Sequence, residues 1–157
     1  MAESSLSATL PETAPRPVQT DRLQGIVGYP LRRAQLAVFD DFVRRFAALD
    51  LTPAQFSTLV VIRDNPDRRQ SDIAAALGIQ PPNFVALMDE FERRGLAQRV
   101  RSGADRRANA LKLTSAGARL LTQALDVQAE QEAAIRVRIG EAARLALIAT
   151  LDRLGGI

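Results

Sequence analysis

Cysteine and histidine are both absent from this chain of 157 residues. Without cysteine there is no thiolate nucleophile, no thiol redox switch and none of the usual cysteine-containing zinc sites. Without histidine there is no Ser-His-Asp triad and no histidine general base. The only lysine, Lys112, falls in a predicted surface strand. These absences argue against an enzyme, and we predict neither a metal nor a cofactor.

Aromatic residues are also scarce, at 4% of the chain, whereas apolar residues reach 46%. That apolar fraction is enough for a globular core, which must be mostly aliphatic and suits helices built from alanine and leucine. No run of about 18 apolar residues occurs, and the N-terminus lacks the basic and apolar regions of a secretory signal. We therefore expect a soluble, cytoplasmic protein that does not enter a membrane.

Positive charge is concentrated in one stretch, residues 93–112. Seven basic residues against one acidic residue give this stretch a net charge of +6, whereas the whole chain carries only +3. The remainder of the chain is therefore net negative. A concentrated positive stretch on a nearly neutral body is typical of a protein that binds phosphate groups. The same charges are also compatible with an ordinary solvated surface.

Turn signals and hydrophobic periodicity divide the chain into four parts. Residues 1–20 contain three prolines among small and polar residues and are predicted to form a disordered tail. Residues 21–50 have a one-sided helical pattern that begins or kinks near Pro30. Residues 51–114 carry the signals of a DNA-binding domain, and residues 115–157 contain two further helical patterns.

The signals within residues 51–114 indicate a helix-turn-helix. A capping box, Thr52-Pro53-Ala54-Gln55, opens a helix that ends near Asn65-Pro66. Ser71 starts a short helix that Gly78 closes, and only two residues then separate Gly78 from Pro81-Pro82, which open the next helix. A short helix, a tight turn containing glycine and a second helix are the parts of this motif.

Two short extended runs, 97–101 and 109–113, follow the second helix and flank a Ser-Gly-Ala-Asp turn. They predict a β-hairpin of the kind that forms the wing of a DNA-binding domain. The expected fold is mostly α with a small β-hairpin wing: a winged helix-turn-helix flanked by N- and C-terminal helices.

The second helix of a helix-turn-helix enters the major groove with its N-terminal residues first. Gln80 and Asn83 lie at that end, and both side-chain amides can pair with adenine. Gln80 is equally compatible with a simple helix cap. The exposed face also offers three acidic residues, of which Asp89 is expected to pair with a nearby arginine. The predicted DNA-binding residues are Gln80, Asn83, Ala86, Arg93, Arg94, Arg101, Asp105, Arg106 and Arg107.

In the wing, Arg106 and Arg107 follow Asp105 directly. Adjacent residues of a hairpin point to opposite sides, so only one of these arginines can enter the minor groove. We expect Asp105 to orient that arginine. A surface salt bridge is the alternative for this pair.

These motifs resemble the MarR family of winged-helix regulators. The resemblance runs from Leu51 to about Gly117 and is most specific in Asp105-Arg106-Arg107-Ala108-Asn109-Ala110-Leu111-Lys112-Leu113-Thr114. It implies that Arg107 is the minor-groove arginine with Asp105 as its partner. It also implies that the first helix and the last two helices form a homodimer interface, with a ligand crevice beside the DNA-binding part. Many members have Thr-Arg where this chain has Val85-Ala86, so the usual arginine contact to a base is missing.

A finer resemblance concerns residues 28–35 and 81–87, which are similar to the branch that regulates hydroxycinnamate breakdown. It implies an aromatic acyl-CoA effector such as p-coumaroyl-CoA or feruloyl-CoA. Arg32 and Arg33 are candidates to hold phosphates or a carboxylate, and Tyr29 is a candidate to bond a phenolic group. All three are also compatible with ordinary solvated or half-buried positions.

The sequence therefore predicts a homodimeric, ligand-responsive repressor of genes for aromatic-compound catabolism or efflux, released from DNA by a small aromatic acid or an aromatic acyl-CoA. Its operator is expected to be a pseudo-palindrome in double-stranded DNA with half-sites roughly 34 Å apart. Two alternatives remain open. The acidic residues Asp89, Glu90 and Glu92 favour a protein-interaction module, and the charged stretch alone would also suit a non-specific architectural DNA binder.

Overall fold

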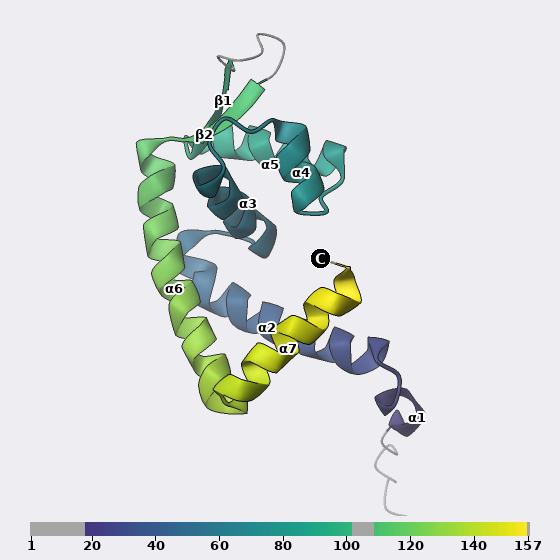
Figure 1. The fold of residues 1–157 in the computed structure, drawn as a ribbon. Coiled ribbons are helices and arrows are strands. Elements are labelled where there is room, and N and C mark those ends of the chain that lie inside the picture. Colours follow the sequence, from purple (N-terminus) through teal and green to yellow (C-terminus); the bar gives the residue numbers. More distant parts are fainter. Residues whose placement is uncertain (1–17, 102–108, 157) are drawn as a thin grey trace, which may run out of the picture. The chain divides into compact units, whose positions relative to one another are not determined.

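The structure is a computed structural model that describes residues 18–101 and 109–156 (Figure 1). Its elements in chain order are α1 (Asp21–Gln24), α2 (Gly28–Phe46), the short 3-10 helix η1 (Ala47–Leu49), α3 (Pro53–Asp64), α4 (Gln70–Ala76), α5 (Pro81–Arg93), β1 (Ala97–Arg101), β2 (Asn109–Leu113), α6 (Ser115–Ile139) and α7 (Glu141–Gly155). The chain divides after Gln35 into two compact units. The mostly helical winged fold predicted from the sequence is confirmed.

The N-terminal helical pattern is interrupted rather than continuous. α1 ends at Gln24 and α2 begins at Gly28, two residues before the predicted start at Pro30. Pro30 lies in the first turn of α2, where its missing N–H removes no helical hydrogen bond. At the other end, α2 passes into η1, and Asp50 then adopts a left-handed conformation.

Capping residues mark the start of α3 and the ends of α4 and α5, as predicted. The Thr52 hydroxyl accepts a hydrogen bond from the Gln55 N–H (3.2 Å), and the Gln55 side chain accepts one from the Thr52 N–H (2.9 Å). This capping box starts α3. Gly78 and Gly95 have φ of +63° and +66°, which allows the chain to leave α4 and α5. α4 starts at Gln70, one residue before the prediction.

The hairpin has the predicted bounds on both strands. Its antiparallel register runs from Ala97 opposite Leu113 to Arg101 opposite Asn109. An additional bridge joins Arg69 to Ala110, so β2 also pairs with the segment that connects α3 to α4. In Figure 1 the hairpin lies beside α5. Backbone hydrogen bonds hold the short connection between them, such as the bond from the Leu96 N–H to the Phe91 carbonyl.

The hydrophobic core gathers residues from α2 through α6. Phe84, Met88 and Phe91 form the buried stripe of α5, as predicted, and Leu87 is half-buried. Although aromatic residues are few, four of the six phenylalanines are buried. The core residues are Phe42, Phe46, Leu51, Leu59, Ile62, Ile73, Ala74, Phe84, Met88, Phe91, Leu96, Ala97, Leu111, Leu121 and Ala124.

The start of α6 is fastened to the hairpin at very close range. The Thr114 hydroxyl accepts a hydrogen bond from the Gly117 N–H (3.0 Å) and donates one to the Gly95 carbonyl (2.6 Å). A Cβ atom added to Gly117 would lie 1.9 Å from the carbonyl oxygen of Leu96. Only glycine therefore permits this contact between α6 and the residue that precedes β1.

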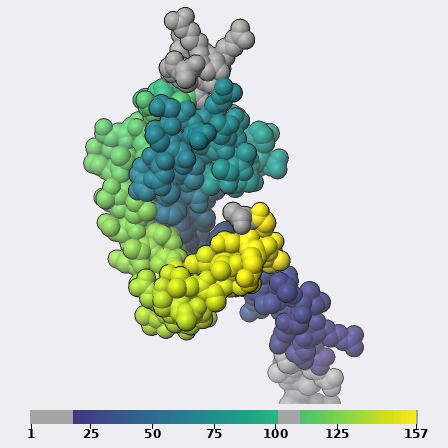
Figure 2. Space-filling model, in the orientation of Figure 1, coloured from purple at the N-terminus to yellow at the C-terminus, as the bar shows by residue number. Residues whose placement is uncertain are grey.

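Two helices keep apolar faces uncovered. α7 has no buried residue, and its atoms, yellow in Figure 2, lie at the surface of the face shown there. The predicted one-sided stripe of α2 is buried only in part. Phe42 and Phe46 are buried, whereas the other large apolar residues of the stripe are exposed. The exposed large apolar residues of these faces are Leu36, Phe39, Val43, Leu145, Leu147, Ile148, Leu151 and Leu154. No helix within the described ranges is long and apolar enough to cross a membrane.

Candidate nucleic-acid interface

The N-terminal half of α5 presents the predicted reading residues to solvent. Gln80, Asn83 and Ala86 are all exposed, whereas Phe84 and Met88 of the same helix are buried. Gln80 is the N-cap residue of α5, but its side chain makes no capping hydrogen bond. Gln80 therefore lies at the cap position with a solvated side chain, which leaves its predicted contact with DNA and the alternative of a simple cap or solvated residue both open. This end of the helix has the amide groups and the exposure that a major-groove contact needs.

Arg93 and Arg94 are adjacent in sequence but have different surroundings. The Arg93 side chain is 72% exposed and pairs with Glu90 at 2.6 Å. Its hydrogen bonds lower the pKa of the Glu90 carboxyl, which stays charged and offsets the arginine. Arg93 thus lies on the exposed surface of α5, where it forms an ion pair with the Glu90 carboxylate.

Arg94, which is also a predicted DNA contact, makes its described contacts within the fold. Its side chain is only 17% exposed, and its guanidinium donates hydrogen bonds to the carbonyls of Asp50 (2.7 Å) and Leu49 (3.4 Å). These carbonyls belong to the end of η1, which leaves α2 and precedes α3. Arg94 is committed to holding the end of α5 against that junction and is not presented to a phosphate.

The charge centre of the site is Arg99, which the sequence analysis did not single out. From β1 its guanidinium forms ion pairs with two carboxylates of α5, Glu92 (2.5 Å) and Asp89 (2.8 Å). The Arg99 Nε donates to the Gln70 side chain in α4 (3.0 Å), and Nη2 donates to the Val85 carbonyl (3.4 Å). One side chain therefore joins both helices of the helix-turn-helix to the wing. The expectation that Asp89 pairs with a nearby arginine is confirmed.

These contacts change the electrostatic meaning of residues 93–112. Their positive charge is partly offset by carboxylates that lie elsewhere in the sequence, so the net charge of the stretch overstates the field that it presents. The ion pairs join Arg93 to Glu90, Arg94 to Asp50, Arg99 to Asp89 and Glu92, and Lys112 to Asp67.

The predicted wing residues are only partly within the structure. Arg101 is the last residue of β1, where its backbone pairs with Asn109. Asp105, Arg106 and Arg107 lie outside the described residues. Their roles stay predictions.

The predicted effector residues lie in the first unit of the chain. Tyr29 and Arg33 line a cavity of about 530 Å³ together with Thr20, whereas Arg32 is exposed and is not among the lining residues. Hydrogen bonds from Thr20 and Arg33 lower the pKa of the Tyr29 hydroxyl, with Thr20 the larger cause. The fold thus brings together two of the three predicted residues.

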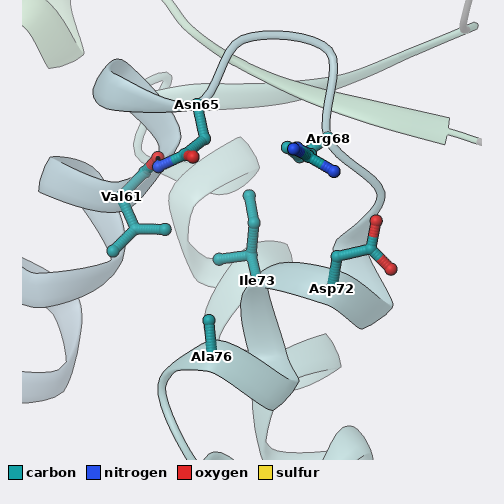
Figure 3. A pocket seen from close by; sticks show the side chains of 6 residues that line it. All are labelled: Val61, Asn65, Arg68, Asp72, Ile73 and Ala76. Carbon is teal, nitrogen blue, oxygen red and sulfur yellow. Dashed lines mark hydrogen bonds between the residues drawn. The ribbon is translucent and has the colours of Figure 1, made fainter. Parts of the chain in front are cut away.

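A second hollow lies between α3 and α4 (Figure 3). It has a volume of about 230 Å³. In the close-up, Ile73 lies between Val61 on one side and the charged side chains of Arg68 and Asp72 on the other. None of the predicted contact residues lines this hollow. In the same described parts of the chain, no group of three acidic residues is placed to hold a metal ion.

The fold and the exposed end of α5 define a winged helix-turn-helix protein with long flanking helices. The MarR family model matches residues 49–108. A Thauera aromatica protein, named as a transcriptional regulatory protein for the hcr operon, is 32% identical over 133 residues, which are 84% of this chain and 80% of that protein.

Two solved structures of the transcriptional repressor CouR are also similar to this chain. CouR bound to a 23-mer DNA duplex is 42% identical, with a TM-score of 0.85, over 89% of this chain and 99% of that one. CouR bound to p-coumaroyl-CoA is 41% identical, with a TM-score of 0.83, over 88% of this chain and 98% of that one. The chain belongs to the MarR family of regulators.

Proposed function

We propose that this chain is a homodimeric transcriptional repressor that binds a DNA operator and is released from it by an aromatic acyl-CoA. The observation that carries the proposal is the likeness to CouR over nearly the whole chain, both in a DNA-bound and in a p-coumaroyl-CoA-bound structure. The proposal includes control of genes for aromatic-compound catabolism or efflux, a cytoplasmic location and no catalytic role.

The proposed DNA contacts lie on α5 and on the hairpin. Gln80 and Asn83 meet base edges at the exposed N-terminal end of α5, and Ala86 lies one turn further along that surface. Arg93 reaches the phosphate backbone from the C-terminal end of the helix. In the wing, Arg101, Arg106 and Arg107 approach the DNA, with Arg107 in the minor groove beside Asp105. Arg94 has no part in this interface.

The proposed effector contacts are Tyr29 and Arg33. Thr20 and Arg33 lower the pKa of the Tyr29 hydroxyl, and this hydroxyl is the proposed partner of a phenolic group. The Arg33 guanidinium supplies a positive charge in the same cavity for a carbonyl or phosphate oxygen of the thioester. Arg32, which is exposed beside them, serves as a comparison rather than as a contact.

The DNA part of the proposal is tested with the purified protein and the DNA upstream of its own gene, in excess random competitor at physiological salt. A discrete complex that survives the competitor is expected, with a preference of about 10³-fold or more over random sequence. Loss of the complex to random DNA would instead favour an architectural binder. No binding even at low salt would favour a protein-interaction module.

The effector part is tested by titrating p-coumaroyl-CoA, feruloyl-CoA and the two free acids against that complex. The thioesters should release the DNA at lower concentrations than the acids. Arg33→Gln should raise the thioester concentration needed for half-release by about tenfold, the effect of losing one charged hydrogen bond. Arg32→Gln is the matched control and should change it little. Release by none of the four compounds would reject this class of effector.

A further inference from the structure

An apolar facet lies on the part of α5 that is proposed to enter the major groove. Pro82, Val85 and Ala86 are all exposed, and their i, i+3, i+4 spacing places them on one side of the helix. Val85 is 42% exposed, the only large apolar residue of the helix-turn-helix that is left open to this degree. Its position on the proposed reading helix, rather than its exposure alone, makes it available for a contact with DNA.

The chemistry of the major groove offers one partner for such a facet. Side chains of proline, valine and alanine have no donor or acceptor, so they cannot pair with the polar edges of bases or with phosphates. The 5-methyl group of thymine is the one apolar group that base pairs present there. We propose that Val85, supported by Ala86, recognises a thymine methyl group in each half-site of the operator.

The neighbours of the facet fit that partner. Asn83 precedes Ala86 by one turn and is exposed, and its amide can pair with the adenine of an A·T pair in the same half-site. Ala86 is short, so the helix can approach the base edges closely enough for the valine methyl groups to reach a thymine. An arginine at this position would instead reach toward guanine. The facet therefore favours half-sites in which A·T pairs lie opposite the N-terminal part of α5.

The backbone beneath the facet is held in place. Arg99 donates a hydrogen bond to the carbonyl of Val85 at 3.4 Å and pairs with Asp89, one turn further along α5. Asp89 carries its negative charge next to the facet and remains 62% exposed. A carboxylate in that position repels phosphates and leaves the adjacent apolar side chain to meet the interior of the groove rather than the DNA backbone.

This inference rests on the proposed DNA binding and is tested with duplexes selected from a random pool by the full-length protein. Each thymine of the selected site is replaced in turn by deoxyuridine, which removes only the methyl group. Wild-type affinity should fall about fourfold when the contacted thymine is replaced in one half-site, and about fifteenfold when it is replaced in both.

Val85→Ala then identifies the side chain that reads the methyl group. The variant should bind the thymine duplex about fifteenfold more weakly than wild type, because the homodimer loses the contact in both half-sites, and it should no longer distinguish this duplex from the deoxyuridine duplex. Val18→Ala is the matched control, because Val18 is an 89% exposed valine that precedes the first helix, and it should keep the full discrimination.

Several results would overturn the inference. Sequence-specific binding that is indifferent to deoxyuridine at every position would reject methyl recognition while leaving the repressor proposal intact. Discrimination that persists undiminished in Val85→Ala would assign it to another residue. Failure to select any sequence from the pool would reject the DNA-binding proposal itself. The deoxyuridine series needs only the wild-type protein, so the inference can fail even if the variant does not fold.

Discussion

Arg99 connects three elements through one guanidinium. Its partners are Asp89 and Glu92 on α5, Gln70 on α4 and the Val85 carbonyl. The Arg99 side chain is only 21% exposed, so its charge is largely removed from water and depends on these partners. In such a position the arginine acts as a fastener between wing and reading helix, and its contribution to DNA binding comes from geometry rather than from contact with phosphates.

Replacing Arg99 by methionine should therefore cost both stability and DNA affinity. Two carboxylates would lose their shared cation, and we expect a loss of about 2–4 kcal/mol in the free energy of unfolding. Urea unfolding measures this loss, and DNA titration measures the loss of affinity. Arg63→Met is the control, because Arg63 pairs only with its exposed neighbour Asp64, and it should cost less than about 1 kcal/mol. Equal effects of the two variants would contradict the fastener role.

Arg94 and Arg107 should differ in how they affect the salt dependence of DNA binding. Arg94→Gln removes hydrogen bonds to the Asp50 and Leu49 carbonyls, so it should lower stability by about 1–3 kcal/mol and leave the slope of log K against log salt unchanged. Arg107→Gln should reduce that slope by about 0.9, the value for one phosphate contact. Fluorescence anisotropy at several salt concentrations gives both slopes. A reduced slope for Arg94→Gln would return it to the interface.

At the scale of elements, local sequence signals predict the helix-turn-helix and the hairpin, but they do not predict the long-range contacts. The bounds of β1 and β2 follow from alternation and a turn, and the start of α3 follows from Thr52 and Gln55. The partners of Arg94 lie 44 and 45 residues away, and the bridge from Arg69 to Ala110 spans a similar distance. No sequence period encodes such partners, so a run of arginines looked more exposed than it is.

The junction of α6 with the hairpin should tolerate no side chain at Gly117. A Cβ atom there would lie 1.9 Å from the Leu96 carbonyl oxygen, and both partners are backbone, so helix and hairpin must separate. Gly117→Ala should destabilise the protein by about 3 kcal/mol or more, seen as a lower melting temperature. Gly28→Ala is a matched control, since nothing lies within 4 Å of its added Cβ atom. An unchanged melting temperature for Gly117→Ala would show that the two elements are loosely joined.

The contact between α2 and α6 should make the fold sensitive to acid. Asp41 accepts hydrogen bonds from Arg45 (2.7 Å), Arg44 (3.1 Å) and the buried Gln131 (3.3 Å), and chiefly the bond from Arg45 lowers its pKa. Because the folded-state pKa is below the unfolded one, this stabilisation is complete above about pH 4 and is lost as the pH falls through the folded-state pKa.

Thermal melting between about pH 6 and pH 2 tests this expectation. Asp41→Asn should melt at a lower temperature than wild type at neutral pH and should show a shallower decline in acid. Asp40→Asn, at the exposed neighbouring position, should follow the wild-type curve. Parallel curves for wild type and Asp41→Asn would remove Asp41 as the source of acid sensitivity.

At the scale of the whole molecule, no side chain has an ordinary pKa between 6 and 8, because histidine is absent. Among the residues that the structure describes, the carboxyl groups with a displaced pKa are displaced downward, away from neutrality: Asp41, Asp64, Glu90 and Glu141. DNA affinity should therefore vary by less than about twofold across this window at constant salt. Operator titrations at pH 6, 7 and 8 measure it. A sharp change would require a titrating group that arises only in the complex.

The uncovered face of α7 makes this protein's behaviour depend on how much of it is present. Among the described residues of one chain, none buries the leucines and isoleucine of that helix, and in the proposed homodimer a second copy supplies the cover that their apolar burial needs. Melting temperature should then rise with protein concentration. On dilution, operator occupancy falls more steeply than the number of molecules, because two chains must meet before either can hold the DNA. The cellular concentration of the regulator would thereby itself control operator occupancy.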